Sequence, residues 1–530
     1  MCAGMYGFVE DAIRDYSFVR DYVFSSAKKQ VMKMTLGNYP APLKIIEVLK
    51  KSVESKGLNK PKGYDIEADG FSDLCITPQS QGLQALFFAQ TATKKNPYKN
   101  ARPVKQVGVL GAGLMGAGIA EITITKDIPV VLKDVTAAGL AVGETNILKS
   151  MQTQVKRKRI SSFEADRTIS RLIGVHDGMD SWKTHIGKCD MVIEAVFENL
   201  ALKHKIVEQM ESVCKESCII ATNTSSLPVA DIAVHAARPE NIVGMHYFSP
   251  VPKMQLLEII PHAGTSEDVI AAAVAMGLKQ GKLPIVCKDV PGFFVNRCLG
   301  PYIDETICLI LEMDNMLKMD KAMKNFGFPV GPLTLADEAG VEVAFHLHAN
   351  LQKDLGVRVG GANKDAMKAI LDAGIKGKRF NAGLLSYPSG KKPSGLAAMN
   401  PFATKPSPKP NPVVLEALKP FMKPGKVTEE EVQQRIQARF VNETVFCLQD
   451  GVIKSAADGD VASIFGIGFP PFTGGPFRYI DSIGTTKYVD ILNRLADQVL
   501  PSFILSSLAL PPPFCPCPLR YLLVSQDFYS

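Results

Sequence analysis

The sequence predicts an α/β domain with a doubly wound, mostly parallel sheet, followed by two related all-helical domains. Short apolar strands alternate with helices from residue 104 to about residue 288. Beyond Pro291-Gly292-Phe293 the pattern becomes almost purely helical, and a Gly-Phe-Pro motif occurs twice, at 327–329 and at 468–470. The 530-residue chain therefore contains several folding units, because a single hydrophobic core does not extend over this length.

Residues 1–103 favour helices. Apolar residues at three- and four-residue spacing predict helices over 17–31 and 42–53, and a further helix is expected over 78–95. Pro97 and Pro103 indicate a linker that leads into the first strand.

The stretch VKQVGVLGAGLMGAGIA, residues 104–120, carries the most specific signal in the chain. A buried strand over 107–110 runs into Gly111, Gly113 and Gly116, which have GxGxxG spacing, and a helix of small residues follows. The first glycine permits a tight turn, the second lets the backbone approach a pyrophosphate, and the third lets helix and strand pack closely. The pyrophosphate would bind the unpaired N–H groups at the helix start. We therefore expect a Rossmann-type domain.

Asp134 ends the second apolar run, about 20 residues beyond the glycines. Its carboxylate can accept hydrogen bonds from ribose hydroxyls and would repel a 2′-phosphate, which favours NAD over NADP. Two alternatives remain at this point. The 42 glycines of the chain also produce chance matches in other α/β domains, and FAD uses similar loops.

The rest of the chain continues the alternation of strands and helices to about residue 288 and favours helices beyond it. We expect a helix pair over 145–171, a helix over 202–213, and strands over 189–196, 218–223, 242–246 and 255–260. Two helical units begin at Tyr302–Thr306 and Val441–Thr444, and a proline-rich, loop-like stretch lies between them. The predicted domains are a helical segment (1–103), the dinucleotide domain (104–288), two helical domains (289–380 and 431–497) with a proline-rich connection (381–430), and an atypical tail (498–530).

Four polar residues near predicted strand ends and the domain junction form the candidate catalytic set: Ser225, His246, Glu258 and Asn296. Oxidation of a secondary alcohol needs a base, and imidazole titrates near neutral pH. Glu258 interrupts an apolar strand and therefore needs a partner. If the two strands pair, its carboxylate orients the histidine, while the serine and the amide donate to substrate oxygens. Alternatively, His246 is structural, and Ser225 and Asn296 cap helices.

Composition excludes several classes of function. A net charge of +7 is mild for this length and suits an anionic small substrate better than a nucleic acid. The 11 cysteines form no CxxC pair and no His/Cys cluster at zinc spacing, so we expect free thiols and no metal. No segment has the roughly 20 apolar residues of a membrane span, and we expect neither a secretory signal nor a transit peptide at the start.

Five segments carry a family resemblance: GAGLMGAGIA (111–120), DMVIEAVFENLALKH (190–204), ATNTSSLP (221–228), GMHYFSPVPKMQLLEIIPH (244–262) and GFPVGPLTLADEAG (327–340). Together they resemble the L-3-hydroxyacyl-CoA dehydrogenase family. The tandem helical repeat and the helices before it are similar to the α subunits of fatty-acid β-oxidation multienzymes, of the mitochondrial trifunctional protein and of its bacterial counterpart. The similarity runs from about residue 1 to about residue 495.

The resemblance implies NAD-dependent oxidation of (3S)-3-hydroxyacyl-CoA to 3-oxoacyl-CoA. It implies that His246 is the catalytic histidine, that Glu258 is its paired glutamate, and that Ser225 and Asn296 contact the substrate. The remaining matches are Gly111, Gly113, Gly116 and Asp134 in the NAD loop, Glu198 and Lys203 on the nicotinamide side, the basic run 156–159 near the coenzyme A phosphates, and Ser249, where many members have asparagine.

The resemblance also implies a context. A complete α subunit begins with an enoyl-CoA hydratase domain, of which residues 1–103 resemble only the last helices and the linker, so we expect an N-terminally truncated chain without hydratase activity. A thiolase β subunit is the implied partner, and the mitochondrial matrix, with peripheral membrane association, is the implied location. The tail over 498–530 resembles no part of the family.

Two other functions remain open from the residues. Hydroxyisobutyrate- and phosphogluconate-type dehydrogenases also join a glycine loop to helices, but they use a lysine where this chain offers the His246–Glu258 pair. The chain could instead be a noncatalytic interaction module, because the helices of residues 1–103 would pack on another domain or subunit.

Overall fold

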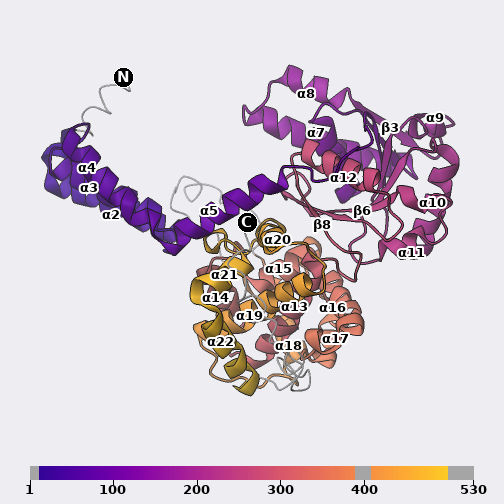
Figure 1. Cartoon of the computed structure of the whole chain (residues 1–530). Coiled ribbons are helices and arrows are strands. Elements are labelled where there is room, and N and C mark those ends of the chain that lie inside the picture. Colours follow the sequence, from indigo (N-terminus) through magenta and orange to yellow (C-terminus); the bar gives the residue numbers. More distant parts are fainter. Residues whose placement is uncertain (1–10, 388–407, 499–530) are drawn as a thin grey trace, which may run out of the picture.

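The computed structural model describes residues 11–387 and 408–498. These residues form a helical arm, an α/β domain and a helical domain (Figure 1). Residues 388–407 of the predicted proline-rich connection and 499–530 of the predicted tail lie outside the described residues.

The α/β domain contains one eight-stranded sheet with the strand order β3-β2-β1-β4-β5-β6-β7-β8. Neighbouring strands are parallel throughout, except that β7 runs antiparallel to β6. The predicted mostly parallel, doubly wound sheet is therefore confirmed. The strands are β1 (Val107–Leu110), β2 (Val130–Asp134), β3 (Leu172–His176), β4 (Met191–Glu194), β5 (Ile219–Thr222), β6 (Ile242–Tyr247), β7 (Leu256–Ile260) and β8 (Leu283–Val286).

Helices cover both faces of this sheet. On one face α6 (Leu114–Ile124), α7 (Ala137–Lys156) and α12 (Glu267–Lys279) bury a continuous apolar core, and α8 (Ser162–Ile169) packs on α7. On the other face a second core is closed by α9 (Trp182–Ile186), α10 (Leu200–Val213) and α11 (Val229–Ala233). The short helix η1 (Pro239–Asn241) precedes β6.

The helical domain contains a tandem repeat of helices around one large core. In the first copy α13 (Val295–Glu312) and α14 (Leu317–Phe326) lead through a Gly-Phe-Pro turn to α15 (Pro332–Ala339). In the second, α19 (Glu429–Gln449) and α20 (Ala456–Ile467) lead through η5 (Pro471–Thr473) to α21 (Pro476–Ile483). The other elements are α16 (Val341–Leu355), η2 (Gly356–Val359), α17 (Lys364–Asp372), η3 (Lys378–Phe380), β9 (Leu385–Ser386), β10 (Lys409–Pro410), α18 (Pro412–Leu418) and α22 (Thr485–Gln498).

Both copies close the turn with the same device. Asp320 of α14 accepts a hydrogen bond from the backbone N–H of Leu333 at 2.8 Å, and Asp460 of α20 accepts one from Phe477 at 2.8 Å. Each carboxylate therefore supplies an acceptor to the unpaired N–H groups at the start of the next helix. This explains why the Gly-Phe-Pro motif repeats with an aspartate before it.

Three expectations about the helical part were wrong. Tyr302–Thr306 and Val441–Thr444 do not begin their units but lie inside α13 and α19, because their acidic residues make buried ion pairs instead of a turn. The stretch between the units is not purely loop-like. Asn411 caps α18, whose first residue, Pro412, suits a helix start.

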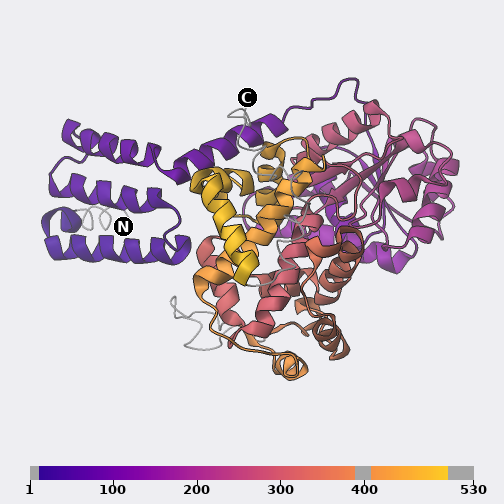
Figure 2. The same ribbon diagram turned by 60° about the horizontal axis from the view of Figure 1, so that its bottom comes forward.

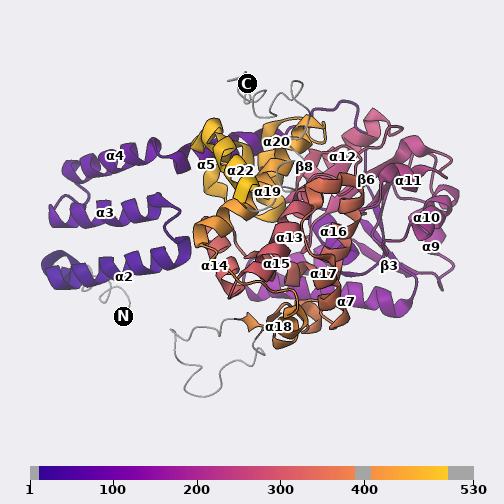
Figure 3. The same cartoon turned by 90° about the horizontal axis from the view of Figure 1, so that it is seen from below.

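The segment before the α/β domain forms an arm. The helices α2 (Ser17–Thr35), α3 (Pro40–Glu54) and α4 (Pro61–Cys75) lie side by side in one layer that projects from the rest of the chain (Figures 2 and 3). The sequence reading missed α4, whose glycines and acidic residues obscure its apolar spacing. The helix α5 (Pro78–Thr93) joins the arm to the helical domain, where Leu86 and Ala89 enter the large core.

Candidate active site

The glycine loop connects β1 to α6, and each glycine meets a different local constraint. Gly111 has a φ of +94°, and a Cβ there would lie 2.7 Å from the carbonyl oxygen of Ala195. A Cβ at Gly116 would lie 1.8 Å from the carbonyl oxygen of Gly111. At Gly113 a Cβ would meet nothing within 4 Å. The loop thus combines a tight turn and close packing with open space before the first turn of α6, which fits a pyrophosphate.

Asp134 lies next to this loop. It is the last residue of β2, and its Oδ2 accepts a hydrogen bond from the backbone N–H of Ala112 at 2.8 Å. A half-buried carboxylate therefore lies at the carboxyl edge of the sheet beside the glycines, where the ribose hydroxyls of a dinucleotide are bound in such folds.

His246 and Glu258 form a buried pair on adjacent strands. The antiparallel register of β6 and β7 places these two residues directly opposite each other, and His246 Nδ1 lies 2.6 Å from Glu258 Oε2. The exposed fractions are 6% for the histidine and 0% for the glutamate. The rings of Phe248 and Phe293 lie 4.5 and 5.7 Å from the imidazole, centroid to centroid. The predicted side-by-side arrangement of these strands is therefore what the structure contains.

The other oxygen of Glu258 is held by the start of α13. Oε1 accepts hydrogen bonds from the backbone N–H groups of Phe294 at 3.1 Å and Val295 at 2.9 Å. The thiol of Cys287 lies 3.9 Å from the same oxygen. Burial first, and then the Glu258 carboxylate, raise the pKa of this thiol well above its usual value, so it stays protonated. The buried carboxylate is thus fully hydrogen-bonded, as a buried charge requires.

Ser225 and Asn296 meet at the junction of the two domains. The side-chain amide of Asn296 donates to the carbonyl oxygen of Ser225 at 2.9 Å, and Ser225 itself is exposed. Glu198 accepts from the backbone N–H groups of Ser225 at 2.9 Å and Ser226 at 3.1 Å, and from the hydroxyl of Thr224 at 2.7 Å. Glu198 therefore fixes the loop that carries Ser225.

The charge of Glu198 is stabilised by these partners. Burial would raise the pKa of this carboxyl, but Lys203 and the hydrogen bonds from the loop hold it below its usual value. The resulting carboxylate is ionised at neutral pH and accepts several hydrogen bonds at once.

Lys203 lies deeper than the sequence suggested. Its exposed fraction is 1%, and its Nζ donates to both oxygens of Glu194, at 2.9 and 2.8 Å. Its distance to Glu198 Oε2 is 3.4 Å. Sequence reasoning missed Glu194, although it is a buried carboxylate at the end of the apolar strand β4, comparable to Glu258 inside β7. The same rule, that a buried carboxylate needs a partner, would have found it.

Two further contacts hold the loops around His246, and no local sequence pattern indicates either. The backbone N–H of Tyr247 donates to the side chain of Asn223 at 2.8 Å, which ties the ends of β5 and β6 together. The ammonium of Lys282 donates to the carbonyl oxygens of Val251 and Met254, both at 2.5 Å. Burial lowers the pKa of Lys282 to about 8.

The structure connects the predicted site residues through direct contacts. The start of α13 links Glu258 to Asn296, which bonds to the loop of Ser225, and Glu198 links that loop to Lys203. The glycine loop approaches the end of β4 at Ala195. The basic run 156–159 and Ser249 are exposed.

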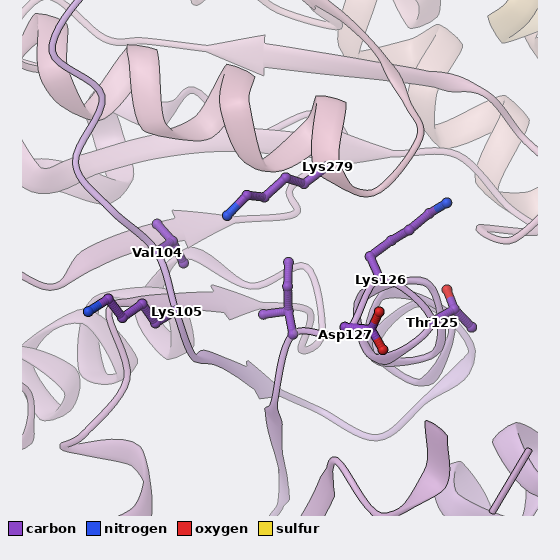
Figure 4. Close-up of a pocket in the computed structure, with 7 residues that line it drawn as sticks. Val104, Lys105, Thr125, Lys126, Asp127 and Lys279 are labelled. Atoms are coloured by element: carbon purple, nitrogen blue, oxygen red, sulfur yellow. The ribbon is translucent and has the colours of Figure 1, made fainter. Parts of the chain in front are cut away.

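A separate hollow of about 510 Å³ lies at the opposite edge of the sheet (Figure 4). Lys105, Lys126 and Lys279 line it, but their ammonium groups do not converge on one point. Two of them stand at the carboxyl ends of α6 and α12, where cations offset the helix dipoles. This hollow therefore does not belong to the site.

The described ranges contain neither a metal-binding cluster nor a membrane-spanning helix. Over residues 11–387 and 408–498, no group of three or more His, Cys, Asp or Glu side chains is arranged to hold a metal ion. Among the helices of these ranges, none combines the length and apolar character needed to cross a membrane.

Comparison with known proteins identifies the two domains. The NAD-binding domain of 3-hydroxyacyl-CoA dehydrogenases matches residues 106–290, and the C-terminal domain of the same enzymes matches residues 292–387. The chain is 42% identical over 490 residues to the fatty acid oxidation complex subunit alpha of Shewanella frigidimarina (strain NCIMB 400). This alignment covers 91% of the chain but only 65% of the relative.

Solved structures agree with this assignment. The (S)-3-hydroxybutyryl-CoA dehydrogenase PaaH1 from Ralstonia eutropha is 32% identical, with a TM-score of 0.51, over 54% of this chain and 100% of that chain. The 3-hydroxybutyryl-CoA dehydrogenase from Escherichia coli K12 has the same fold, with a TM-score of 0.65 over 81% of this chain and 100% of that chain, at 24% identity. The chain belongs to the 3-hydroxyacyl-CoA dehydrogenase family, whose first domain binds NAD.

Proposed function

We propose that this chain oxidises (3S)-3-hydroxyacyl-CoA to 3-oxoacyl-CoA with NAD, as a step of fatty-acid β-oxidation. The observation that carries the proposal is the buried His246–Glu258 pair, 2.6 Å apart, on the sheet that also presents the glycine loop. A base with a fixed orientation beside a dinucleotide site is what the removal of a hydroxyl proton and a hydride requires.

His246 takes the hydroxyl proton. Glu258 occupies Nδ1, so Nε2 is the ring atom left to accept the proton. The carboxylate then stabilises the imidazolium as it forms. The N–H groups of Phe294 and Val295 hold the other carboxylate oxygen, so Glu258 cannot turn away during the reaction. When bound, NAD supplies the acceptor for the hydride.

Ser225 and Asn296 hold the substrate oxygens. Ser225 is exposed at the domain junction, and its hydroxyl, which donates to Glu198 at 3.3 Å, turns to donate to the developing 3-oxo group when substrate binds. Asn296 uses one N–H on the Ser225 carbonyl and keeps the other N–H and its carbonyl oxygen for the thioester region. Glu198 acts through the loop, because it fixes the backbone of Ser225 and Ser226.

The same edge of the sheet holds the cofactor. Gly111, Gly113 and Gly116 shape the pyrophosphate site at the start of α6, and the Asp134 carboxylate suits the ribose hydroxyls and disfavours a 2′-phosphate. Lys203 is paired with Glu194 and lies near Glu198, so we assign it to positioning the nicotinamide side of the cleft.

Stereochemistry tests this proposal directly. Purified protein is mixed with NAD and either (3S)- or (3R)-3-hydroxybutyryl-CoA, and NADH is followed by its absorbance. We expect turnover of the (3S) isomer with NAD and little with NADP. Correctly folded protein that binds NADH but turns over neither isomer would contradict the proposal and favour the noncatalytic interaction module.

A lysine-based dehydrogenase is the second enzymatic candidate, and the geometry argues against it. Two buried lysines lie near the site, and both have other partners: Lys203 is paired with Glu194, and Lys282 donates to the carbonyl oxygens of Val251 and Met254. The histidine has a dedicated carboxylate partner. Lysine chemistry is excluded if Lys203→Met and Lys282→Met each lower kcat much less than His246→Ala does.

We propose a wider context from the resemblance. The chain spans about 65% of the length of the fatty acid oxidation complex subunit alpha with which it was compared. We propose that it works with a thiolase β subunit in the mitochondrial matrix, peripherally on the membrane. Copurification of thiolase with the native protein and fractionation of source cells test these points.

A further inference from the structure

We infer that Glu443, in the second helical repeat, is a positioning residue for the active site and acts through Arg297. The inference rests on the proposed function. Arg297 directly follows Asn296 in the first turn of α13, and the N–H groups just before it hold Glu258. A contact that holds Arg297 in place therefore also holds the side-chain amide of Asn296 and, through the backbone N–H groups, Glu258.

The guanidinium of Arg297 is anchored on α19 and on Asp450, the residue that follows this helix. Its Nε donates to Glu443 Oε1 at 2.7 Å, and its Nη2 donates to Asp450 at 2.5 Å. Arg297 is 5% exposed and Glu443 is 2% exposed. Arg358 also donates to Asp450, at 3.0 Å. When one partner of such a buried pair is removed, the other charge is left uncompensated, and the neighbouring backbone has to move.

A second ion pair joins the same two helices with the roles exchanged, because here the arginine is on α19 and the glutamate is on α13. We call Arg297–Glu443 the first bridge and Arg435–Glu305 the second bridge. Arg435 of α19 donates through Nε to Glu305 of α13 at 2.6 Å, and it also reaches Glu312 at 2.6 and 3.0 Å. In each helix the arginine and the glutamate are eight residues apart, at 297 and 305 and at 435 and 443. The two long helices thus exchange equivalent ion pairs.

Only one of the two bridges lies at the site. Arg297 is in the turn that carries Asn296, whereas Glu305, Glu312 and Arg435 form contacts with one another and with Arg439 and Glu431. None of the candidate site residues is among their ion-pair partners in the described ranges. The second bridge is therefore a matched internal control, with the same chemistry, the same helices and similar burial.

Loss of the first bridge should change the positions of the catalytic groups at the start of α13 and leave cofactor binding unchanged. If the first turn of α13 shifts, Asn296 and the two N–H groups on Glu258 shift with it. A displacement of about 1 Å at a catalytic group is enough to lower a rate by about 10²-fold. Asp134 bonds to Ala112, and the atoms nearest to Gly111 and Gly116 belong to the loop itself, to β1 and to the chain after β4, so NADH binding should be unchanged.

The experiment compares Glu443→Gln with Glu305→Gln in the full chain. Acetoacetyl-CoA reduction gives kcat and KM, NADH fluorescence gives Kd, and thermal unfolding gives Tm. We expect Glu443→Gln to lower kcat about tenfold or more with Kd within about twofold. Glu305→Gln should lower Tm similarly but keep kcat within about twofold of the parent. Equal kcat losses, or none in Glu443→Gln, would overturn the inference.

Two additions keep the result decisive. If the buried variants do not fold, Asp450→Asn and Glu312→Gln test the same two bridges at partners that are 39% and 38% exposed. Amide hydrogen exchange of Phe294–Arg297 needs no turnover: exchange should rise only when the first bridge is broken, and equal exchange in both variants would refute the positioning role. An inactive parent protein would contradict the proposed function alone, because the exchange comparison still decides this inference.

Discussion

Glu258 shows how single hydrogen bonds decide chemistry at the scale of one residue. It has no exposed surface, and it is held by the His246 ring and by two backbone N–H groups. Such a carboxylate is costly to bury unless every lone pair has a donor. Its position opposite His246 then follows from the strand register and needs no flexible adjustment.

Replacing Glu258 by Gln should therefore damage the reaction while keeping the fold. The amide has the same shape but no charge to stabilise the imidazolium, so we expect kcat to fall by about 10²- to 10⁴-fold. Steady-state kinetics with acetoacetyl-CoA and NADH measure this. Glu211→Gln is the control, because Glu211 also accepts two backbone N–H groups, those of Ala237 and Arg238, away from the site. Similar losses in both variants would argue against a catalytic pair.

Glu198 should make stability depend on pH. Its pKa in the folded chain lies below the usual value, so its charge stabilises the fold above about pH 4.3. This contribution disappears as the pH falls through the folded-state pKa. We expect Glu198→Gln to lower the free energy of unfolding by about 1 to 3 kcal/mol at pH 7, and the difference from the parent to shrink in acid. Urea unfolding between pH 3 and pH 7 measures it; a constant difference would contradict the assignment.

At the scale of an element, two glycines of the β1–α6 turn have different roles: Gly116 allows close packing, and Gly113 leaves room for the cofactor. A Cβ at Gly116 would collide with a carbonyl oxygen, whereas a Cβ at Gly113 would meet open space. We expect Gly116→Ala to cost at least about 1 to 3 kcal/mol of stability. Gly113→Ala should cost less than about 1 kcal/mol but weaken NADH binding about tenfold or more, because about 1.4 kcal/mol of lost contact has this effect.

Thermal unfolding and NADH titration of both glycine variants check this pair of outcomes. The interpretation fails if Gly113→Ala binds NADH as tightly as the parent chain does. It also fails if Gly116→Ala is as stable as the parent.

The elements that the sequence predicted share a local signal. The glycine spacing, the apolar strands and the carboxylate inside β7 are all visible within a few residues, and each pointed to the correct place. The edge strand β8 was missed because Pro284 and its neighbours carry no alternation. The edge strand β3 is only partly buried, so its pattern is weak as well.

The partners of the predicted residues come from distant segments and could not be predicted. The N–H groups that hold Glu258 lie 36 and 37 residues away, and Asn296 reaches Ser225 across 71 residues. The acidic residues in the middle of α13 and α19 suggested a turn, because their arginine partners are on the other helix, 130 and 146 residues away in the chain. Composition and periodicity contain no information on such pairs.

At the scale of the whole molecule, a close backbone contact of α5 helps to attach the arm to the helical domain. A Cβ at Gly82 of α5 would lie 2.6 Å from the carbonyl oxygen of Phe472 in η5. Only a glycine lets these backbones approach so closely. The layer of α2, α3 and α4 buries little surface of its own, since α2 has no buried residue. The orientation of the arm thus relies on α5 (Figure 1) and on the turn between α2 and α3, where Asn38 donates to the carbonyl oxygen of Asn325 at 3.1 Å and the ring of Tyr39 packs on Phe472.

Gly82→Val should release the arm without affecting the site. We expect faster proteolytic cleavage between α4 and the α/β domain, and a kcat within about twofold of the parent. Limited proteolysis with mass spectrometry, together with the acetoacetyl-CoA assay, measures both. Gly425→Val is the control, because this exposed glycine does not have a positive φ, the nearest atom to a Cβ there is 3.9 Å away, and the position is far from α5 in the chain. Unchanged cleavage in Gly82→Val would show that other contacts anchor the arm.

The central claim is that His246 transfers the proton, and one measurement tests it most directly. Acetoacetyl-CoA reduction is followed by the loss of NADH absorbance in the parent chain and in His246→Ala. We predict that kcat falls by about 10²- to 10⁴-fold while the Kd for NADH stays within about twofold. A His246→Ala protein that reduces acetoacetyl-CoA at a rate near that of the parent would contradict the account.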